Sequence, residues 1–211
     1  MSLATCHRSR DLGASVISKR PAGGFPLVDE ESDDPIVAPV FGRLKQRWGT
    51  VLNIYRVLGW SPQLVKAWSS FAWSMRFDLN ASRRLRELLV IRIASLLGAE
   101  YEYQHHLAMA LDEGVSPEQV TDLSEWRTSA KFDATDKAVL AMADELALGT
   151  GASADTMASL RRTLGERDTV ELMVTGSFYC GVARIINSAQ VQLEPHHGDL
   201  RARNIDPDTA T

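Results

Sequence analysis

Glu87, Glu102 and His106 are the residues of this sequence whose types and spacing best suit catalytic chemistry. Glu102 and His106 are four residues apart, so on a helix they lie one turn apart on one face, which Ala99 shares. Glu87 belongs to the helical segment before it. Proton transfer needs a positioned base or acid and a carboxylate that orients it. The pattern therefore predicts a carboxylate–imidazole site built on two consecutive helices.

Gly98 separates the two helical segments, and its position indicates which of these residues meet. If the chain reverses there, a rise of ~1.5 Å per residue places Glu87 about 16 Å back and His106 about 12 Å forward. Glu87 and His106 then differ in depth by about 4–5 Å, against about 10 Å for Glu87 and Glu102. We therefore expect Glu87 to face His106.

Three further residues are predicted to bind substrate: Arg92, Tyr179 and Arg184. A guanidinium offers two parallel donors to a carboxylate, which makes Arg92 and Arg184 candidates for that role. Arg184 has a structural alternative, because it could instead bond the terminus of a neighbouring helix. We expect His105, next to His106, to be a solvated histidine.

The three central residues also admit other interpretations. A glutamate in a buried helix is more often an ion-pair partner than a catalyst. Glu102 and His106 could form only a helix-stabilising pair. Together with Glu87 they could hold a divalent ion, but the second Glu-x-x-His of helical carboxylate sites is missing. We predict no metal and no other cofactor.

Apolar side chains recur at helical spacing from Pro35 onward. This spacing predicts that helices hold the candidate site residues in place. No segment combines period-two alternation with enrichment in β-branched residues. The sequence therefore predicts an all-α, compact multi-helix fold. The helices are expected at about 37–48, 51–58, 62–75, 82–97, 99–113, 134–148, 154–164 and 169–189, with a short one opened by Ser116-Pro117.

Two of these helices carry most of the expected core. The helix over 82–97 is apolar on nearly every face, which marks a buried central helix, and its charges Glu87 and Arg92 need partners. The helix over 62–75 has an apolar side that we expect to face the core: Leu64, Val65, Trp68, Phe71, Ala72 and Met75.

The segment Arg83–Val120, RRLRELLVIRIASLLGAEYEYQHHLAMALDEGVSPEQV, resembles the core of the carboxymuconolactone decarboxylase and alkylhydroperoxidase D superfamily. The resemblance covers roughly residues 36–194. It includes three further stretches: Asn53–Arg56 with Ser61-Pro62, Asp136–Val139 and Phe178–Asn187.

The peroxidase branch of that superfamily has a glutamate followed by a CxxCxxxH motif. This chain keeps Glu87 and His106 but has Ala99 and Glu102 at the two cysteine positions. Dithiol peroxide reduction needs a thiolate and a resolving thiol, so the alkylhydroperoxidase activity is disfavoured. The decarboxylase branch also lacks the CxxC motif.

The resemblance therefore implies acid–base chemistry, either decarboxylation or another proton transfer, on a small carboxylated or lactone-type substrate. His106, held by Glu87, would be the catalytic acid, and Glu102 would tune it or act as a second base. The alternatives are a metal-dependent enzyme and an oligomeric binding protein without catalysis. The resemblance also implies a homo-oligomer, and five tryptophans add apolar surface for self-association.

Composition limits the partners and the location. The chain has 211 residues, a net charge of -4 and a pI of about 5.7, so no attraction to nucleic acid or to an anionic membrane is expected. Cys6 and Cys180 are too far apart for a CxxC pair, which suggests a reducing cytoplasm. No apolar run approaches the roughly 18 residues of a membrane span. We expect a cytoplasmic protein that binds a small-molecule substrate.

The chain divides into three parts. Residues 1–34 mix Ser, Arg, Gly and Pro and end in an acidic run, which predicts a mobile N-terminal arm. Residues 35–194 form the expected helical domain. Residues 195–211 follow the last helical pattern and are expected to be a C-terminal tail.

Overall fold

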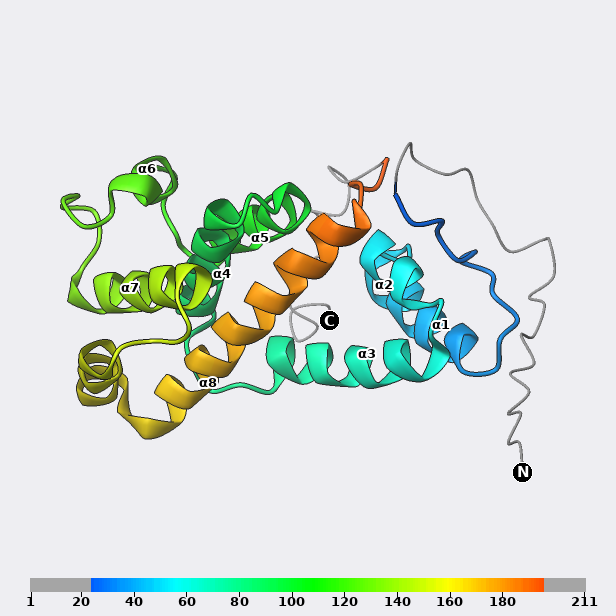
Figure 1. Cartoon of the computed structure of the whole chain (residues 1–211), viewed down its shortest axis with the longest axis horizontal. Coiled ribbons are helices and arrows are strands. Elements are labelled where there is room, and N and C mark those ends of the chain that lie inside the picture. Colours follow the sequence, from blue (N-terminus) through cyan, green and yellow to red (C-terminus); the bar gives the residue numbers. More distant parts are fainter. Residues whose placement is uncertain (1–23, 196–211) are drawn as a thin grey trace, which may run out of the picture.

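A computed structural model describes residues 24–195, which form eight α-helices and one short 3₁₀ helix (Figure 1). No strand occurs within these residues, so the predicted all-α fold is confirmed. The elements are α1 (Val37–Trp48), α2 (Asn53–Leu58), α3 (Pro62–Phe77), α4 (Arg83–Leu96), α5 (Glu100–Asp112), α6 (Pro117–Thr121), η1 (Asp122–Glu125), α7 (Ala134–Leu148) and α8 (Ala154–Ala189).

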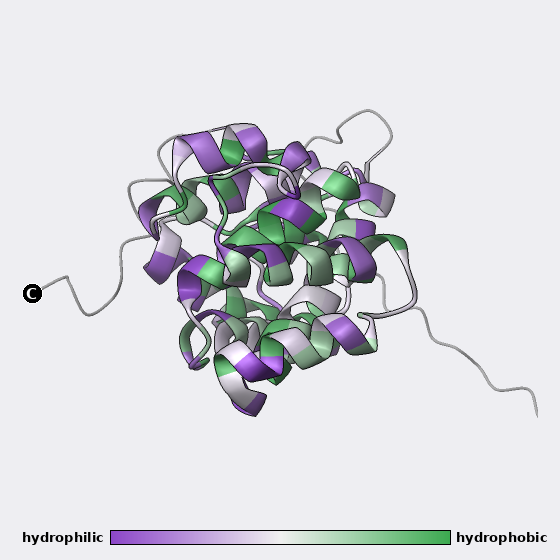
Figure 2. Ribbon diagram, turned by 90° about the vertical axis from the view of Figure 1, so that its left-hand side faces the viewer, coloured by the Kyte–Doolittle hydropathy of each residue, from purple (hydrophilic) through white to green (hydrophobic). Residues whose placement is uncertain are grey.

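Helix α4 is the centre of the fold. It packs against α5, α7 and α8, and every residue from Leu85 to Ala94 is buried. Figure 2 shows hydrophobic residues gathered toward the middle of the bundle and hydrophilic residues toward its outside. The buried central helix that the apolar pattern predicted is therefore present, and its charges are surrounded by protein on all sides.

Glycines with positive φ end the two helices of the site. Gly98 (φ 60°) follows α4 and Gly114 (φ 93°) follows α5. Residues with a side chain rarely adopt this left-handed conformation, so glycine fixes both reversals. Gly165 (φ 80°, ψ 177°) kinks α8 between the two helices expected at 154–164 and 169–189. Ser116 opens α6 with the predicted capping box.

Helix α3 differs from the expectation for its core-facing side. Val65, Ala72 and Met75 are buried, but Leu64 and Phe71 are 49% and 46% exposed. Helix α3 packs against α1 and α2, and Trp68 and Phe71 also contact Phe178 of α8. Leu64 and Phe71 nevertheless keep about half of their surface exposed, so the prediction that they are core residues is wrong for the single chain.

The described part of the predicted arm, residues 24–34, lies against α2. Arg56 donates from Nε to the Val28 carbonyl over 2.9 Å, and the Trp60 indole donates to the Pro26 carbonyl over 2.7 Å. Val28 is itself buried. This segment is thus attached to the helical body, whereas residues 1–23 and 196–211 of the predicted arm and tail lie outside the described residues.

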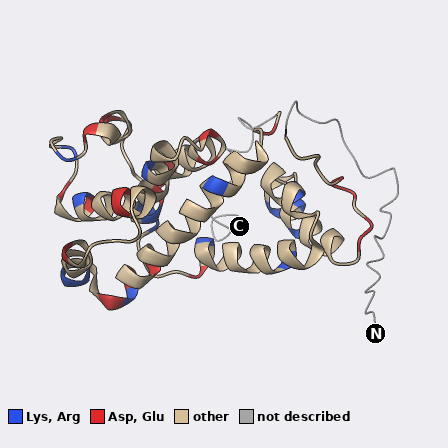
Figure 3. Cartoon of the chain, viewed as in Figure 1, with Lys and Arg blue, Asp and Glu red and all other residues tan. Residues whose placement is uncertain are grey.

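The described chain has charges of both signs throughout and one long apolar helix, α8. Figure 3 shows acidic and basic residues on both halves of the described chain, so neither half carries one sign alone. Helix α8 is long and apolar enough to cross a membrane by length and composition, but half of its apolar window is buried inside the protein. Core helices of soluble proteins share this property.

Candidate active site

The α4–α5 hairpin brings Glu87 and His106 into contact. Nδ1 of His106 lies 2.6 Å from Oε2 of Glu87, and both side chains are buried. The contact follows from the similar depth of the two residues on either side of Gly98. The ring therefore donates its Nδ1 proton to Glu87, which fixes the orientation of the imidazole.

Glu102 lies beside the other nitrogen of the same ring. Its Oε1 is 2.9 Å from Nε2 of His106, one helical turn further along α5. The angles of this contact do not suit a hydrogen bond, and no other described residue bonds Nε2, although the residue is only 2% exposed. Nε2 thus forms an ion-pair contact with Glu102 without a well-aligned hydrogen bond in the described chain.

The two carboxylates determine the charge of His106. Burial alone would lower the pKa of His106, but the negative charges of Glu87 and Glu102 against its two ring nitrogens raise it to about 9. Burial likewise opposes ionisation of Glu87, yet His106 and then Arg76 lower the pKa of that carboxyl. At neutral pH, His106 is therefore an imidazolium acid next to an ionised Glu87.

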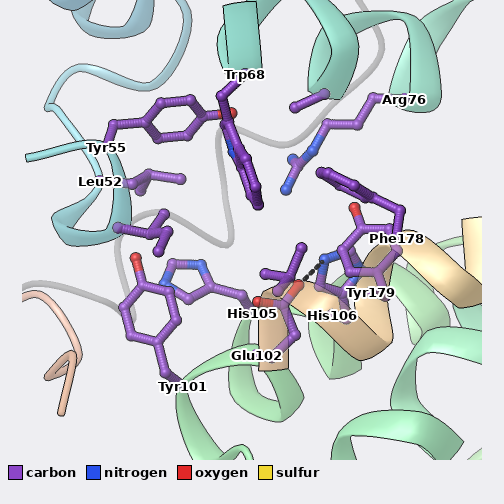
Figure 4. A pocket seen from close by; sticks show the side chains of 13 residues that line it. Leu52, Tyr55, Trp68, Arg76, Tyr101, Glu102, His105, His106, Phe178 and Tyr179 are labelled. Carbon is purple, nitrogen blue, oxygen red and sulfur yellow. Dashed lines mark ion pairs between the residues drawn. The ribbon is translucent and has the colours of Figure 1, made fainter. Parts of the chain in front are cut away.

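A small pocket opens beside this ring (Figure 4). It offers about 40 Å³ to the centres of water-sized molecules, and one water needs only about 10–15 Å³. The Tyr179 ring stands edge-on to the His106 ring at 4.8 Å between centroids. The lining residues come mainly from α2, α3, α5 and α8, and most are apolar or aromatic: Leu52, Ile54, Tyr55, Trp68, Ala72, Arg76, Tyr101, Glu102, His105, His106, Phe178, Tyr179 and Val182.

Arg76 is a pocket residue that the sequence reasoning missed. Its guanidinium enters from α3 (Figure 4) and forms no ion pair with any carboxylate of the described chain. Its side-chain contacts are a 3.9 Å approach to the Met109 sulfur and a stacking contact with Trp48. A signal was present in the sequence, because Arg76 lies four residues after Ala72 and eight after Trp68, within the apolar stripe of α3.

Arg92 does not contribute to this pocket. It lies five residues after Glu87 and therefore points to a different side of α4. Its Nε donates to Asp144 over 2.7 Å, and a terminal nitrogen donates to the Leu123 carbonyl over 3.1 Å. The guanidinium is buried in this ion pair, so the structure does not bring Arg92, a predicted substrate-binding residue, to the pocket.

Arg184 also lies outside the pocket. It donates to the carbonyls of Cys180 and Ala147 over 2.8 and 3.3 Å, and Ala147 belongs to the last turn of α7. The alternative interpretation, a bond to a neighbouring helix terminus, is therefore correct for Arg184. Of the three residues predicted to bind substrate, Tyr179 is the one that lines the pocket.

His105 is buried, which contradicts the expectation that it is solvated. Its Nε2 lies 2.9 Å from Oε2 of Glu194, a buried residue of the segment after α8. Glu194 also accepts from the Tyr101 hydroxyl and from the Asn53 backbone, each over 2.7 Å. Local helical spacing gave no signal for this pairing, because Glu194 is 89 residues away from His105.

The acidic and imidazole groups of the site do not converge on one point. Within residues 24–195, no group of three or more His, Cys, Asp or Glu side chains is arranged to hold a metal ion. Glu87 and Glu102 instead contact opposite nitrogens of one ring. This arrangement suits holding and transferring a proton.

Comparison with known proteins relates this site to one protein family. Residues 62–145, which span α3 to α7 and include the whole glutamate–histidine cluster, match the carboxymuconolactone decarboxylase family. This part of the chain is therefore similar to the carboxymuconolactone decarboxylase family. It has no CxxC motif at the site, because residues 99 and 102 are alanine and glutamate.

Several solved structures share the fold of this chain. A variant of the debrominase Bmp8 in complex with 2,3,4-tribromopyrrole is 21% identical with a TM-score of 0.63, covering 91% of this chain and 96% of its own. A peroxidase-related protein from Silicibacter sp. is 16% identical with a TM-score of 0.67, covering 79% and 91%. An AhpD-type protein of unknown function from Agrobacterium tumefaciens is 21% identical with a TM-score of 0.59, covering 64% and 92%. No curated protein matches the sequence.

Proposed function

We propose that this protein is an acid–base enzyme that acts on a small carboxylated or lactone-type substrate by decarboxylation or another proton transfer. The observation that carries the proposal is the buried cluster in which Glu87 and Glu102 contact the two ring nitrogens of His106, a residue that lines a small pocket. A general acid contributes about 10²–10⁴-fold to a rate when it is positioned at the reacting atom. The similarity to the family supports this class of chemistry but does not specify the reaction.

The proposed reaction needs no external oxidant or reductant. When a carboxylate leaves as carbon dioxide, the electron pair of the broken carbon–carbon bond delocalises into a neighbouring carbonyl. Nε2 of His106 then donates its proton to carbon, and the neutral ring regains a proton from water. Glu87 holds the Nδ1 proton throughout and stabilises the imidazolium, while Glu102 tunes the acid or acts as a second base.

Dithiol peroxide reduction has no support at this site. Ala99 and Glu102 stand at the positions of the two sulfurs, and Cys6 lies outside the described residues. Cys180 is 6% exposed, and burial raises the pKa of its thiol, which disfavours the reactive thiolate. The cytoplasmic location and the homo-oligomeric state stay predictions.

The proposal is tested with carboxymuconolactone and a panel of small unsaturated and keto acids in deuterated water. Proton NMR detects both loss of the carboxylate and incorporation of solvent deuterium at carbon. We expect turnover of at least one compound by the wild type and loss of about 10²–10⁴-fold in His106→Gln. Turnover that is unchanged in His106→Gln, or the absence of turnover across the panel, would reject the proposal.

A thiol-dependent hydroperoxide assay separates the alternative activity. We expect no turnover above that of the Cys6→Ser, Cys180→Ser double variant. Peroxide reduction that disappears in the double variant would overturn the exclusion of dithiol chemistry.

A further inference from the structure

The guanidinium of Arg76 is a cation in the pocket without a carboxylate partner in the described chain. Arg92 and Arg84 each pair with an aspartate over 2.7 Å, whereas Arg76 meets only a sulfur and an aromatic ring through its side chain. A half-buried guanidinium whose donors bond no carboxylate has those donors available to an anion. Burial would lower the pKa of Arg76, but Tyr179, Tyr55, Glu87 and Glu102 raise it, so the group stays charged.

We propose that Arg76 binds the carboxylate of a small, planar, unsaturated acid and thereby selects the substrate of this enzyme. The inference rests on the proposed function for the reaction itself and adds the residue and the ligand class that determine binding. Arg76 thus takes the carboxylate-binding role predicted for Arg92 and Arg184, whose guanidinium groups bond Asp144 and the Ala147 carbonyl.

The pocket walls favour a flat ligand. Trp68 and Phe178 have ring centroids 4.9 Å apart, and Phe178 and Tyr179 have centroids 5.3 Å apart, so the three rings pack against one another as one aromatic wall. Figure 4 shows the Arg76 guanidinium near Trp68 and Phe178, and Tyr179 beside His106. Aromatic walls with a few polar groups bind unsaturated rings through stacked and edge-on contacts.

The charges favour a single carboxylate over a more highly charged anion. A guanidinium matches a carboxylate with two parallel hydrogen bonds. Glu102 lines the same pocket, and Glu87 lies directly behind His106, so a phosphate dianion would face two acidic side chains. The space, about 40 Å³ for the centres of water-sized molecules, holds roughly three waters and therefore favours a small ligand.

The experiment measures binding by isothermal titration calorimetry at pH 7 with two probes of the same shape, benzoate and benzamide. The wild type is expected to bind benzoate about tenfold more tightly than benzamide, because only benzoate pairs with Arg76. Arg76→Met should weaken benzoate binding about tenfold or more and change benzamide binding by less than about threefold. Arg161→Met, which removes an exposed arginine paired with Glu166, is the matched control and should bind both probes as the wild type does.

Three results would overturn the proposal: no preference of the wild type for benzoate, no benzoate binding, or unchanged benzoate binding by folded Arg76→Met. If Arg76→Met fails to fold, the Arg76→Lys variant is used to test the proposal. Lysine keeps the positive charge but loses the two parallel donors, so this variant should weaken benzoate binding by about three- to tenfold. Unchanged binding by Arg76→Lys would then contradict the proposal. Because the probes need no turnover, this test and the His106 turnover assay can fail independently.

Discussion

Helix α4 carries two equally buried charges, Glu87 and Arg92, each 7% exposed, and the surrounding structure uses them differently. Glu87 pairs with His106, which also contacts Glu102 through Nε2 and lines a pocket. Arg92 pairs with Asp144, whose other oxygen accepts from the Trp126 indole. The first pair lies beside a pocket, whereas the second is enclosed by protein donors and acceptors.

This difference teaches that burial of a charge does not by itself identify a functional site. Burial and pairing are alike in the two regions, and buried ion pairs are common structural elements. What separates the regions is a pocket beside the charged groups. His106 and Glu102 line such a pocket, whereas neither Arg92 nor Asp144 lines it.

The largest effect that separates the two regions is expected in turnover. Glu87→Gln removes the charge that holds the imidazolium and should lower kcat about 10²–10⁴-fold. Asp144→Asn, the matched removal of a buried carboxylate, should change kcat per folded molecule by less than about threefold. The deuterium-incorporation assay measures both. Equal losses in the two variants would mean that the regions do not differ in function.

The second effect is expected in stability. Asp144→Asn leaves the Arg92 guanidinium buried without its anion, and breaking a buried pair costs about 3–5 kcal/mol. Urea unfolding followed by circular dichroism gives the free energy of unfolding. Arg92→Met, which removes the charge itself and keeps an apolar stem, is expected to cost less. An Asp144→Asn variant as stable as the wild type would contradict a structural role for this pair.

The pH dependence of stability is a smaller effect and belongs to the Glu87 side. The pKa of His106 is raised from 6.5 to about 9. Its contribution is therefore fully present below pH 6.5 and is lost as the pH rises through about 9, up to roughly 3 kcal/mol in total. Urea unfolding at pH 6, 7.5 and 9.5 should show this loss in the wild type and a flatter profile in His106→Gln. Parallel profiles would refute the coupling.

The smallest effect is expected at Arg184. Its guanidinium bonds only main-chain carbonyls, so Arg184→Met should cost about 1 kcal/mol of unfolding free energy and change turnover by less than about threefold. Thermal unfolding and the turnover assay check this prediction. A loss of turnover comparable to that of Glu87→Gln would return Arg184 to the site.

Sequence patterns predicted the parts of this molecule that depend on local spacing. The helix boundaries at Gly98, Gly114 and Ser116 follow from local backbone preferences, and the contact of Glu87 with His106 follows from helical rise across one reversal. The direction of a long side chain depends on which helices pack around it. Arg76 was therefore missed.

The same limit explains the other differences from the sequence-based expectations. Arg92 meets Asp144 across 52 residues, and His105 meets Glu194 across 89, so no short-range pattern contains either pair. Leu64 fits the apolar stripe of α3, but no described element covers it. Periodicity gives the apolar face of a helix, whereas only the assembled fold shows what that face contacts.

The pKa of His106 is the measurement that tests the central claim most directly. Nitrogen-15 NMR of labelled histidine, assigned by comparison with His106→Gln, follows both ring nitrogens through a pH titration. The account predicts a pKa of about 9 in the wild type, with Nδ1 protonated throughout, and a marked fall toward 6.5 in Glu87→Gln. A wild-type pKa at or below 6.5, unchanged by Glu87→Gln, would contradict the coupled proton-transfer site.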